Sequence, residues 1–251
     1  MIKLLLDGDL FAYRCAAAAE NDDVEHAQHN AELLLDNCIE TLKADSFQFF
    51  LTGEGNFRFQ VYPEYKANRA NTPKPRHLAA MREYLTLKYN AIMSNGVEAD
   101  DLMGIAQCAQ TADEQTIIVS LDKDMLQVPG FHYSWRIEGG PPTKRWVKEA
   151  VYQEITPMQG LRNFYMQMLT GDATDNIKGV SGVGKVKALA ILKEELDEQG
   201  MFDAVRDAYS CDEEMLMNGN CLWILRNYAE TFEQTMRGQE LVQSIKENNV
   251  L

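Results

Sequence analysis

The stretch LLLDGDLFAYR, residues 4–14, places three leucines directly before Asp7-Gly8-Asp9. A short apolar run of this kind is typical of a buried strand. Two carboxylates at the end of such a strand repel each other, by roughly 4 kcal/mol at about 4 Å and an effective dielectric constant near 20. The sequence therefore predicts a compensating group beside Asp7 and Asp9.

Apolar runs and helix-period stretches alternate through the first half of the chain. The apolar runs lie at 2–6, 47–51, 116–120 and 131–135, and the helix-period stretches at about 27–43, 77–89 and 100–110. This alternation indicates an α/β fold with a parallel sheet flanked by helices. It stops near residue 140 at the turn cluster GGPPTKR, and helical patterns follow at about 147–154, 158–169, 185–198 and 201–209. We therefore expect an α/β domain over residues 1–142 and a helical region over residues 143–251.

The composition is that of an ordinary globular protein, with 251 residues that are 45% hydrophobic and 25% charged. No apolar run reaches the length of a membrane span, and the first residues lack the pattern of a signal peptide. The five cysteines form no CxxC pair, so reduced thiols in the core are expected. We expect a monomeric cytoplasmic protein without a membrane partner, in the host cytoplasm if the source is a virus.

The net charge of −14 argues against nucleic acid as a partner, but it hides strong local contrasts. Residues 56–90 hold seven basic and two acidic residues, and residues 178–193 hold four lysines and no acid. The average charge therefore does not exclude DNA binding.

Carboxylates gather at the positions where an α/β sheet places its ligands, beyond the carboxyl ends of the strands. Asp7 and Asp9 follow the first expected strand, and Asp122 and Asp124 follow the third. Further acids lie in GVEADDLMG and TGDATDNIKGV, namely Glu98, Asp100, Asp101, Asp172 and Asp175. Any one pair could be a solvated loop or a helix cap, but the joint pattern favours a metal site. Oxygen ligands without His or Cys suit Mg²⁺ or Mn²⁺ rather than Zn²⁺.

Two segments carry features of nucleic-acid binding. In NIKGVSGVGKVKALAIL, Gly182 and Gly184 precede a helix, and this spacing is typical of a helix-hairpin-helix element over about 170–198. Glycines allow a close approach to phosphate, and Lys185 and Lys187 add charge attraction; the alternative is a turn between packed helices. In YPEYKANRANTPKPRH, aromatic and basic side chains alternate, which suits a single strand, although a solvated basic loop is the alternative. The candidate contacts there are Tyr65, Lys66, Arg69, Lys74 and Arg76.

Taken together, these motifs resemble the 5′-nuclease (flap endonuclease) family. The matching stretches are LLLDGDLFAYR, YPEYKANR, GVEADDLMG, SLDKDMLQV and LTGDATDNIKGVSGVGKVKALAIL, in the family's order over roughly residues 2–198. The resemblance implies a PIN-like α/β domain, a helix-hairpin-helix DNA-binding element, two Mg²⁺ or Mn²⁺ ions and hydrolysis of DNA near free 5′ ends. The substrate would be a flap, nick, gap or duplex end, with an RNA–DNA hybrid as a further candidate.

The resemblance also implies roles for individual residues. It makes Lys66 and Arg69 the phosphate-steering pair, and Val180 and Val183 the backbone ligands of a potassium ion. It assigns metal ligation to eight acids, which are Asp7, Glu98, Asp100, Asp101, Asp122, Asp124, Asp172 and Asp175.

This chain departs from the family pattern at two places. Many members carry an aspartate after the second strand, where FFLTGEG places Thr52. Two alternatives follow: Glu54 substitutes for it, or one metal ion is held more loosely. Asp9 stands where a small polar residue is common.

The lid between the basic motif and EADD is expected to be short. It covers residues 62–95, and only 77–89 has a helical pattern, with Leu78, Met81, Leu85 and Tyr89 on one face. Those side chains are expected to pack on the body and to leave the lid open.

Two other functions fit parts of the sequence. A haloacid-dehalogenase-like phosphatase would use Asp7-Gly8-Asp9 after a strand, but it leaves EADD and the glycine hairpin unexplained. A non-catalytic DNA-binding protein would use the hairpin, but it has no need of so many clustered acids. Both remain open from sequence alone.

Overall fold

The computed structural model describes residues 1–141, 143–194, 196–228 and 230–248. The expected turn residue Pro142 and residue 195, inside the helix expected at 185–198, lie outside this range. None of the helices in the described part of the chain is long and apolar enough to cross a bilayer.

A six-stranded sheet forms the centre of the N-terminal part, in the order β3-β2-β1-β4-β5-β8. Its first five members run parallel, and β8 pairs antiparallel with β5. The strands are β1 (Ile2–Asp7), β2 (Ser46–Glu54), β3 (Ile92–Asn95), β4 (Gln115–Val119), β5 (Gly130–Ser134) and β8 (Val151–Ile155). The α/β fold with a mostly parallel sheet is confirmed.

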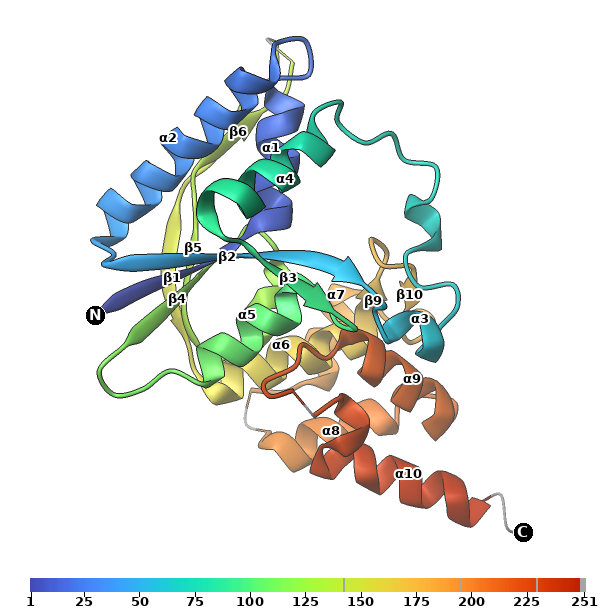
Figure 1. Cartoon of the computed structure of the whole chain (residues 1–251). Helices are drawn as coiled ribbons and strands as arrows, with labels where there is room; N and C mark the ends of the chain where they lie inside the picture. The colour runs from blue at the N-terminus through green and yellow to red at the C-terminus, as the bar shows by residue number, and fades with distance from the viewer. Residues whose placement is uncertain (142, 195, 229, 249–251) are drawn as a thin grey trace.

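Helices cover both faces of this sheet because its central strands are apolar on both sides. Leu4 and Leu6 of β1 face one core, shared with α1 (Gly8–Ala18), α2 (Val24–Leu42) and α4 (Leu78–Tyr89). Leu5 faces the other core, shared with α5 (Ala99–Cys108). Figure 1 shows α1, α2 and α4 on one side of the strands and α5 on the other.

The helix of the expected lid lies on this body. Met81 and Leu85 of α4 are fully buried in the first core, and Leu78 and Tyr89 pack against it. The basic segment before α4 consists of α3 (Arg58–Val61), a 3₁₀ turn (Ala67–Arg69) and the connection to Leu78.

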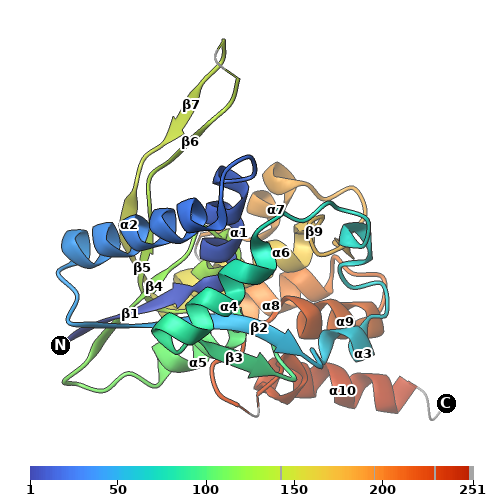
Figure 2. The ribbon, with the colours of Figure 1, turned by 45° about the horizontal axis from the view of Figure 1, so that its top comes forward.

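The sheet does not end at residue 142. A two-stranded hairpin, β6 (Ile137–Gly139) and β7 (Trp146–Lys148), projects from the body (Figure 2) and leads into β8. The helix expected at 147–154 is therefore wrong. Residues 151–155 form an edge strand whose pairing with β5 decides its structure, and an edge strand needs few apolar residues.

The remaining helices pack on a third core. They are α6 (Pro157–Thr170), α7 (Lys185–Ile191), α8 (Glu198–Arg206), α9 (Asp212–Leu222) and α10 (Met236–Asn248). Phe164, Phe202 and Phe232 lie in its centre. Between α6 and α7, the short strands β9 (Gly171–Asp172) and β10 (Ile177–Lys178) pair antiparallel. The helix expected at 185–198 is shorter, because α7 ends at Ile191.

All five cysteines are free, as expected. Cys15, Cys38 and Cys221 are buried, whereas Cys108 and Cys211 are exposed. The expectation that all five lie in the core is therefore wrong for two of them.

Candidate active site

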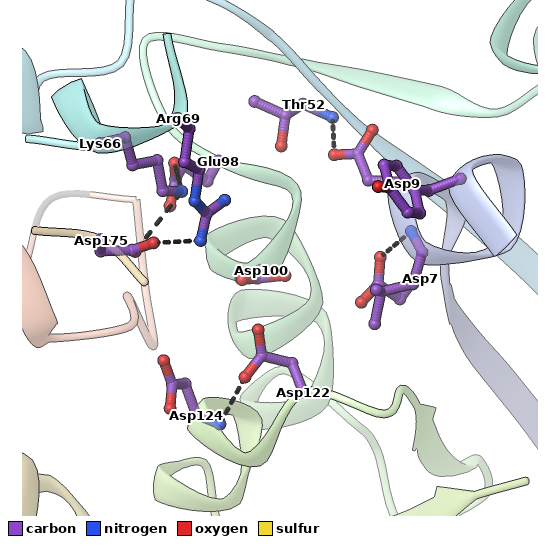
Figure 3. Close-up of a pocket in the computed structure, with 12 residues that line it drawn as sticks. Asp7, Asp9, Thr52, Lys66, Arg69, Glu98, Asp100, Asp122, Asp124 and Asp175 are labelled. Carbon is purple, nitrogen blue, oxygen red and sulfur yellow. Dashed lines mark hydrogen bonds and ion pairs between the residues drawn. The ribbon is translucent and has the colours of Figure 1, made fainter. Parts of the chain in front are cut away.

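A pocket of about 230 Å³ lies at the carboxyl edge of the sheet, where β1 is flanked by β2 on one side and β4 on the other. The strand order reverses at this point, and open α/β sheets bind their ligands there. Figure 3 shows the lining side chains, which come from the end of β1, from α1, β2 and the basic segment, from the start of α5, from the loop after β4 and from the β9–β10 turn. They are Asp7, Asp9, Leu10, Tyr13, Thr52, Lys66, Arg69, Glu98, Asp100, Asp122, Asp124 and Asp175.

Asp7 ends β1 and caps α1. Its carboxylate accepts hydrogen bonds from the Leu10 backbone N–H at 2.9 Å and from the Ser120 hydroxyl at 2.7 Å. Burial nevertheless raises the pKa of Asp7 to about 6, and the nearby charge of Asp122 adds to this. The fold therefore holds a carboxylate that is costly to ionise without a cation.

The first turn of α5 supplies Glu98 and Asp100. Asp100 lies between the two walls of the pocket in Figure 3. Its enclosure raises its pKa well above the ordinary value, and the charges of Asp7, Asp122 and Glu98 add to the shift. Such mutual repulsion is expected at a site that binds a cation from solution.

The loop after β4 supplies Asp122 and Asp124. Asp122 accepts the backbone N–H of Asp124 at 2.9 Å and caps a 3₁₀ turn (Lys123–Gln127). Burial raises the pKa of Asp124 to about 7, with contributions from Asp122 and Asp172. Asp172 is buried behind Asp124 and does not line the pocket. Burial alone would raise the pKa of Asp172, but its hydrogen bond with Asp124 and the charge of Lys123 hold it below the ordinary value.

Lys66 and Arg69 reach the pocket from the basic segment. Lys66 has a left-handed backbone, with φ of 55°, and its N–H donates to the Asp175 carbonyl at 2.9 Å. Its ammonium group pairs with Glu98 and lies 3.5 Å from an Asp175 carboxylate oxygen. Arg69 pairs with Asp175 and donates to the Thr174 carbonyl at 2.8 Å. The two cations thus lie against the acids of one wall.

Two expected site residues have other positions. Asp101 is fully buried and forms a two-pronged ion pair with Arg58, at 2.7 and 2.8 Å, and it does not line the pocket, in contrast to its expected role as a metal ligand. Tyr65 is 2% exposed, and its single hydroxyl hydrogen lies between two carboxylates, at oxygen–oxygen distances of 2.8 Å to Asp175 and 3.1 Å to Glu98. A buried ring cannot stack on a base, so Tyr65 positions acids instead.

Three residues at or near the site were not predicted from the sequence. Tyr13 of α1 is 43% exposed and lines the pocket, and its place four residues after Asp9, on the same face of the helix, was a usable signal. Arg82 of α4 pairs with Asp9. Arg58 forms the ion pair with Asp101, and no local sequence pattern indicates a contact between residues this far apart in the chain.

The residues expected to bind DNA outside the pocket are mostly exposed. Lys74 and Arg76 lie in the connection before α4, and Lys185 and Lys187 lie on α7. Gly182, with φ of 72°, precedes Gly184, and a side chain at either position would meet no atom within 4 Å. The Val180 carbonyl accepts the Val183 N–H at 3.0 Å, which closes the turn before α7.

The donor set fits a hard divalent cation. Seven carboxylates line one pocket without a histidine or cysteine among the described lining residues, and only oxygen ligands are offered. As the side chains lie, no three of the described His, Cys, Asp and Glu side chains converge on a single metal position. Lys66, Arg69 and Arg82 bind several of these acids instead, so the cations of the chain itself partly neutralise the pocket.

Comparison with known proteins gives a consistent result. A family model described as "5′-3′ exonuclease, N-terminal resolvase-like domain" matches residues 3–154. A thermostable DNA polymerase I of Thermus thermophilus is 31% identical over 202 residues, which cover 76% of this chain and 24% of the polymerase. A 5′-3′ exonuclease of Mycoplasma genitalium is 31% identical over 214 residues, covering 76% of this chain and 71% of that protein.

Solved structures with the same fold include two of a bacteriophage T5 protein. The T5 D15 protein co-crystallised with metal ions has a TM-score of 0.63 at 17% identity, over 99% of this chain and 98% of that one. The T5 D15 flap endonuclease in a pseudo-enzyme-product complex with DNA and metal ions has a TM-score of 0.56 at 15% identity, over 98% and 100% of the two chains.

Proposed function

The chain belongs to the 5′–3′ exonuclease family, and on this premise we propose that it is a metal-dependent, structure-specific 5′-nuclease. It would hydrolyse DNA phosphodiesters near free 5′ ends, as an exonuclease or flap endonuclease in replication or repair. The candidate substrates are a flap, a nick, a gap and a duplex end, with an RNA–DNA hybrid as a further candidate.

The observation that carries this proposal is the pocket itself. Acids from four separate parts of the chain meet at the switch point of the sheet, and two cations from the basic segment lie against them. Metal-dependent hydrolysis of a phosphodiester uses both kinds of group. The acids hold the metal ions, and the two side-chain cations balance the negative charge of the phosphate.

The acids that would hold two Mg²⁺ or Mn²⁺ ions are Asp7, Glu98, Asp100, Asp122, Asp124 and Asp175, with Asp172 supporting Asp124. Such ions, when bound, activate a water molecule and stabilise the leaving oxygen. The side chains of Lys66 and Arg69 are already inside the pocket, so they can bind the non-bridging phosphate oxygens once substrate replaces their acid partners. Tyr13 presents an exposed ring on which the terminal base can stack.

The DNA beyond the pocket would follow the exposed basic residues. Lys74 and Arg76 lie before α4 and would guide the single strand, while Lys185 and Lys187 would hold duplex phosphate. The open backbone around Gly182 and Gly184 permits a close approach there. We place the potassium ion of the helix-hairpin-helix element near the carbonyls of Val180 and Val183. The Val180 carbonyl keeps a lone pair free after accepting the Val183 N–H.

The experiment compares three substrates with the full chain, each with Mg²⁺ and with chelator. These are a 5′-flap duplex labelled at its 5′ end, the same duplex labelled at its 3′ end, and a small phosphomonoester. The proposal expects Mg²⁺-dependent release of short products from the 5′ end only. Hydrolysis of the phosphomonoester alone would establish the phosphatase instead, and tight binding without cleavage of any substrate would establish a non-catalytic DNA-binding protein.

A further inference from the structure

The end of β2 contributes no carboxylate to the pocket. Among the described residues of β2, only Thr52 lines it, and the Thr52 hydroxyl accepts the backbone N–H of Ala99 at 3.0 Å. Glu54, the last residue of the strand, is exposed and lies outside the lining. Glu54 is therefore no substitute for the missing acid as the side chains lie, and this side of the pocket depends on acids from elsewhere.

Asp9 reaches that strand end from α1. One of its carboxylate oxygens accepts the Thr52 backbone N–H at 2.9 Å, and the other pairs with Arg82. A second guanidinium nitrogen of Arg82 donates to the Thr52 carbonyl. Figure 3 shows Asp9 beside Thr52, across the pocket from Asp175, Lys66 and Arg69. A side chain of α1 thus places a carboxylate where the strand itself supplies none.

The Asp9–Arg82 pair is open to exchange, in contrast to the Arg58–Asp101 pair. The side chains of Arg82 and Asp9 are 28% and 31% exposed, whereas those of Arg58 and Asp101 are 3% and 0% exposed. A solvent-accessible pair contributes only about 0–1 kcal/mol, so a divalent cation can displace the arginine. Breaking the buried pair leaves an uncompensated charge, so Asp101 is not available in the same way.

We propose that Asp9 is a metal-binding carboxylate of this chain and that Arg82 is its counterion in the metal-free state. The cation replaces the guanidinium group at Asp9, while the Thr52 N–H continues to orient the carboxylate. This inference rests on the proposed nuclease function, since it requires that the pocket bind a divalent cation.

The test is calorimetric titration of Mn²⁺ into the metal-free full chain without DNA. Asp9→Asn should weaken Mn²⁺ binding, by on the order of tenfold. Arg82→Met should strengthen it several-fold, because the competing cation is gone. Glu54→Gln and Lys88→Met are the matched controls, since Lys88 lies on α4 and pairs with Glu32 away from the pocket, and both should leave the affinity unchanged.

The opposite signs of the two effects distinguish a ligand from a structural latch. A latch between α1 and α4 predicts that both variants lower the melting temperature in chelator and shift the Mn²⁺ affinity in the same direction or not at all. That result would overturn the inference. If Arg82→Met does not fold, Arg82→Lys takes its place, because it keeps a positive charge with a different reach. Its Mn²⁺ affinity should lie between that of the unmodified chain and that expected for Arg82→Met. An affinity equal to or below that of the unmodified chain would equally overturn the inference.

Asp122→Asn separates failure of this inference from failure of the proposed function. Weaker Mn²⁺ binding in Asp122→Asn together with unchanged binding in Asp9→Asn rejects only the role of Asp9. Unchanged binding in both variants rejects the metal site and, with it, the proposed nuclease.

Discussion

Removing either partner of the Arg58–Asp101 pair should destabilise the protein far more than it changes metal binding. Arg58 donates to both carboxylate oxygens of Asp101 and also to the backbone carbonyls of Cys221 at 2.9 Å and Trp223 at 2.7 Å. Asp101 in turn accepts the backbone N–H of Leu225 at 3.0 Å. The pair therefore joins α3 and α5 to the segment that follows α9.

The expected magnitude follows from burial. The two side chains are 3% and 0% exposed, so loss of one leaves a charge in a low-dielectric interior. Such a change costs about 3–5 kcal/mol. Arg58→Met also leaves two backbone carbonyls without their donor, which places it at the upper end. The double variant Arg58→Met/Asp101→Asn should lose less than the sum of the single variants, since no uncompensated charge remains.

The assay is urea unfolding in chelator, paired with Mn²⁺ titration of the folded variants. We expect Asp101→Asn to lose stability by the amount above and to change the Mn²⁺ affinity far less than Asp100→Asn does, since Asp101 touches only the backbone N–H of the candidate ligand Glu98. Asp100→Asn is the matched control: it removes a repelled carboxylate, so it should stabilise the metal-free protein and weaken Mn²⁺ binding. An Asp101→Asn variant of normal stability with weakened Mn²⁺ binding would refute this reasoning and restore Asp101 as a ligand.

The remaining predictions concern pH, DNA binding and the lid. In chelator the free energy of unfolding should fall as pH rises from 3.8 to about 7, because Asp7 and Asp124 have raised pKa values and bind more protons in the folded than in the unfolded state. Asp7 alone accounts for about 3 kcal/mol of this loss. The measurement is urea unfolding as a function of pH, and stability that rises over this window would contradict the raised pKa values. Lys185→Ala should weaken duplex binding similarly across sequences and lower by about one unit the slope of log affinity against log salt concentration, measured by fluorescence anisotropy. An unchanged slope would mean that the expected helix-hairpin-helix element serves only in packing. Because α4 packs on the body, the lid should not enclose the strand, so a 5′-biotinylated flap bound by streptavidin beforehand should still be cut, and complete protection would show obligatory threading.

The central strands were predictable because burial on both faces leaves a continuous apolar run. β1 and β4 carry such runs, β2 carries one in its middle, and all three were predicted. β5, with the sequence GFHYS, was predicted from its aromatic side chains instead. β3 was not predicted, because Ile92, Met93 and Asn95 are exposed and only Ser94 is buried, so no apolar face marks it. β8 was taken for a helix because an edge strand is identified by its neighbour rather than by its own side chains.

The site was predictable as a set of segments but not residue by residue. Strand ends, the EADD turn and the GDATD segment predicted six acids that share one pocket, which are Asp7, Glu98, Asp100, Asp122, Asp124 and Asp175. Asp100 and Asp101 are adjacent and about 100° apart on the helix, so only the tertiary structure decides which one faces the pocket. Tyr65 looked accessible because its buried contacts, Glu98 and Asp175, lie 33 and 110 residues away in sequence.

The carboxylate pocket is tested as the active site by single-turnover cleavage of a 5′-labelled flap by Asp122→Asn in Mg²⁺, measured beside the DNA affinity of the same variant in chelator. Asp122 lies in the pocket, away from the exposed lysines of α7. We expect near-normal affinity and a rate lowered by several orders of magnitude, with Lys88→Met on α4, away from the pocket, as an unaffected control. Cleavage by Asp122→Asn at the rate of the unmodified chain would contradict the assignment of the carboxylate pocket as the active site.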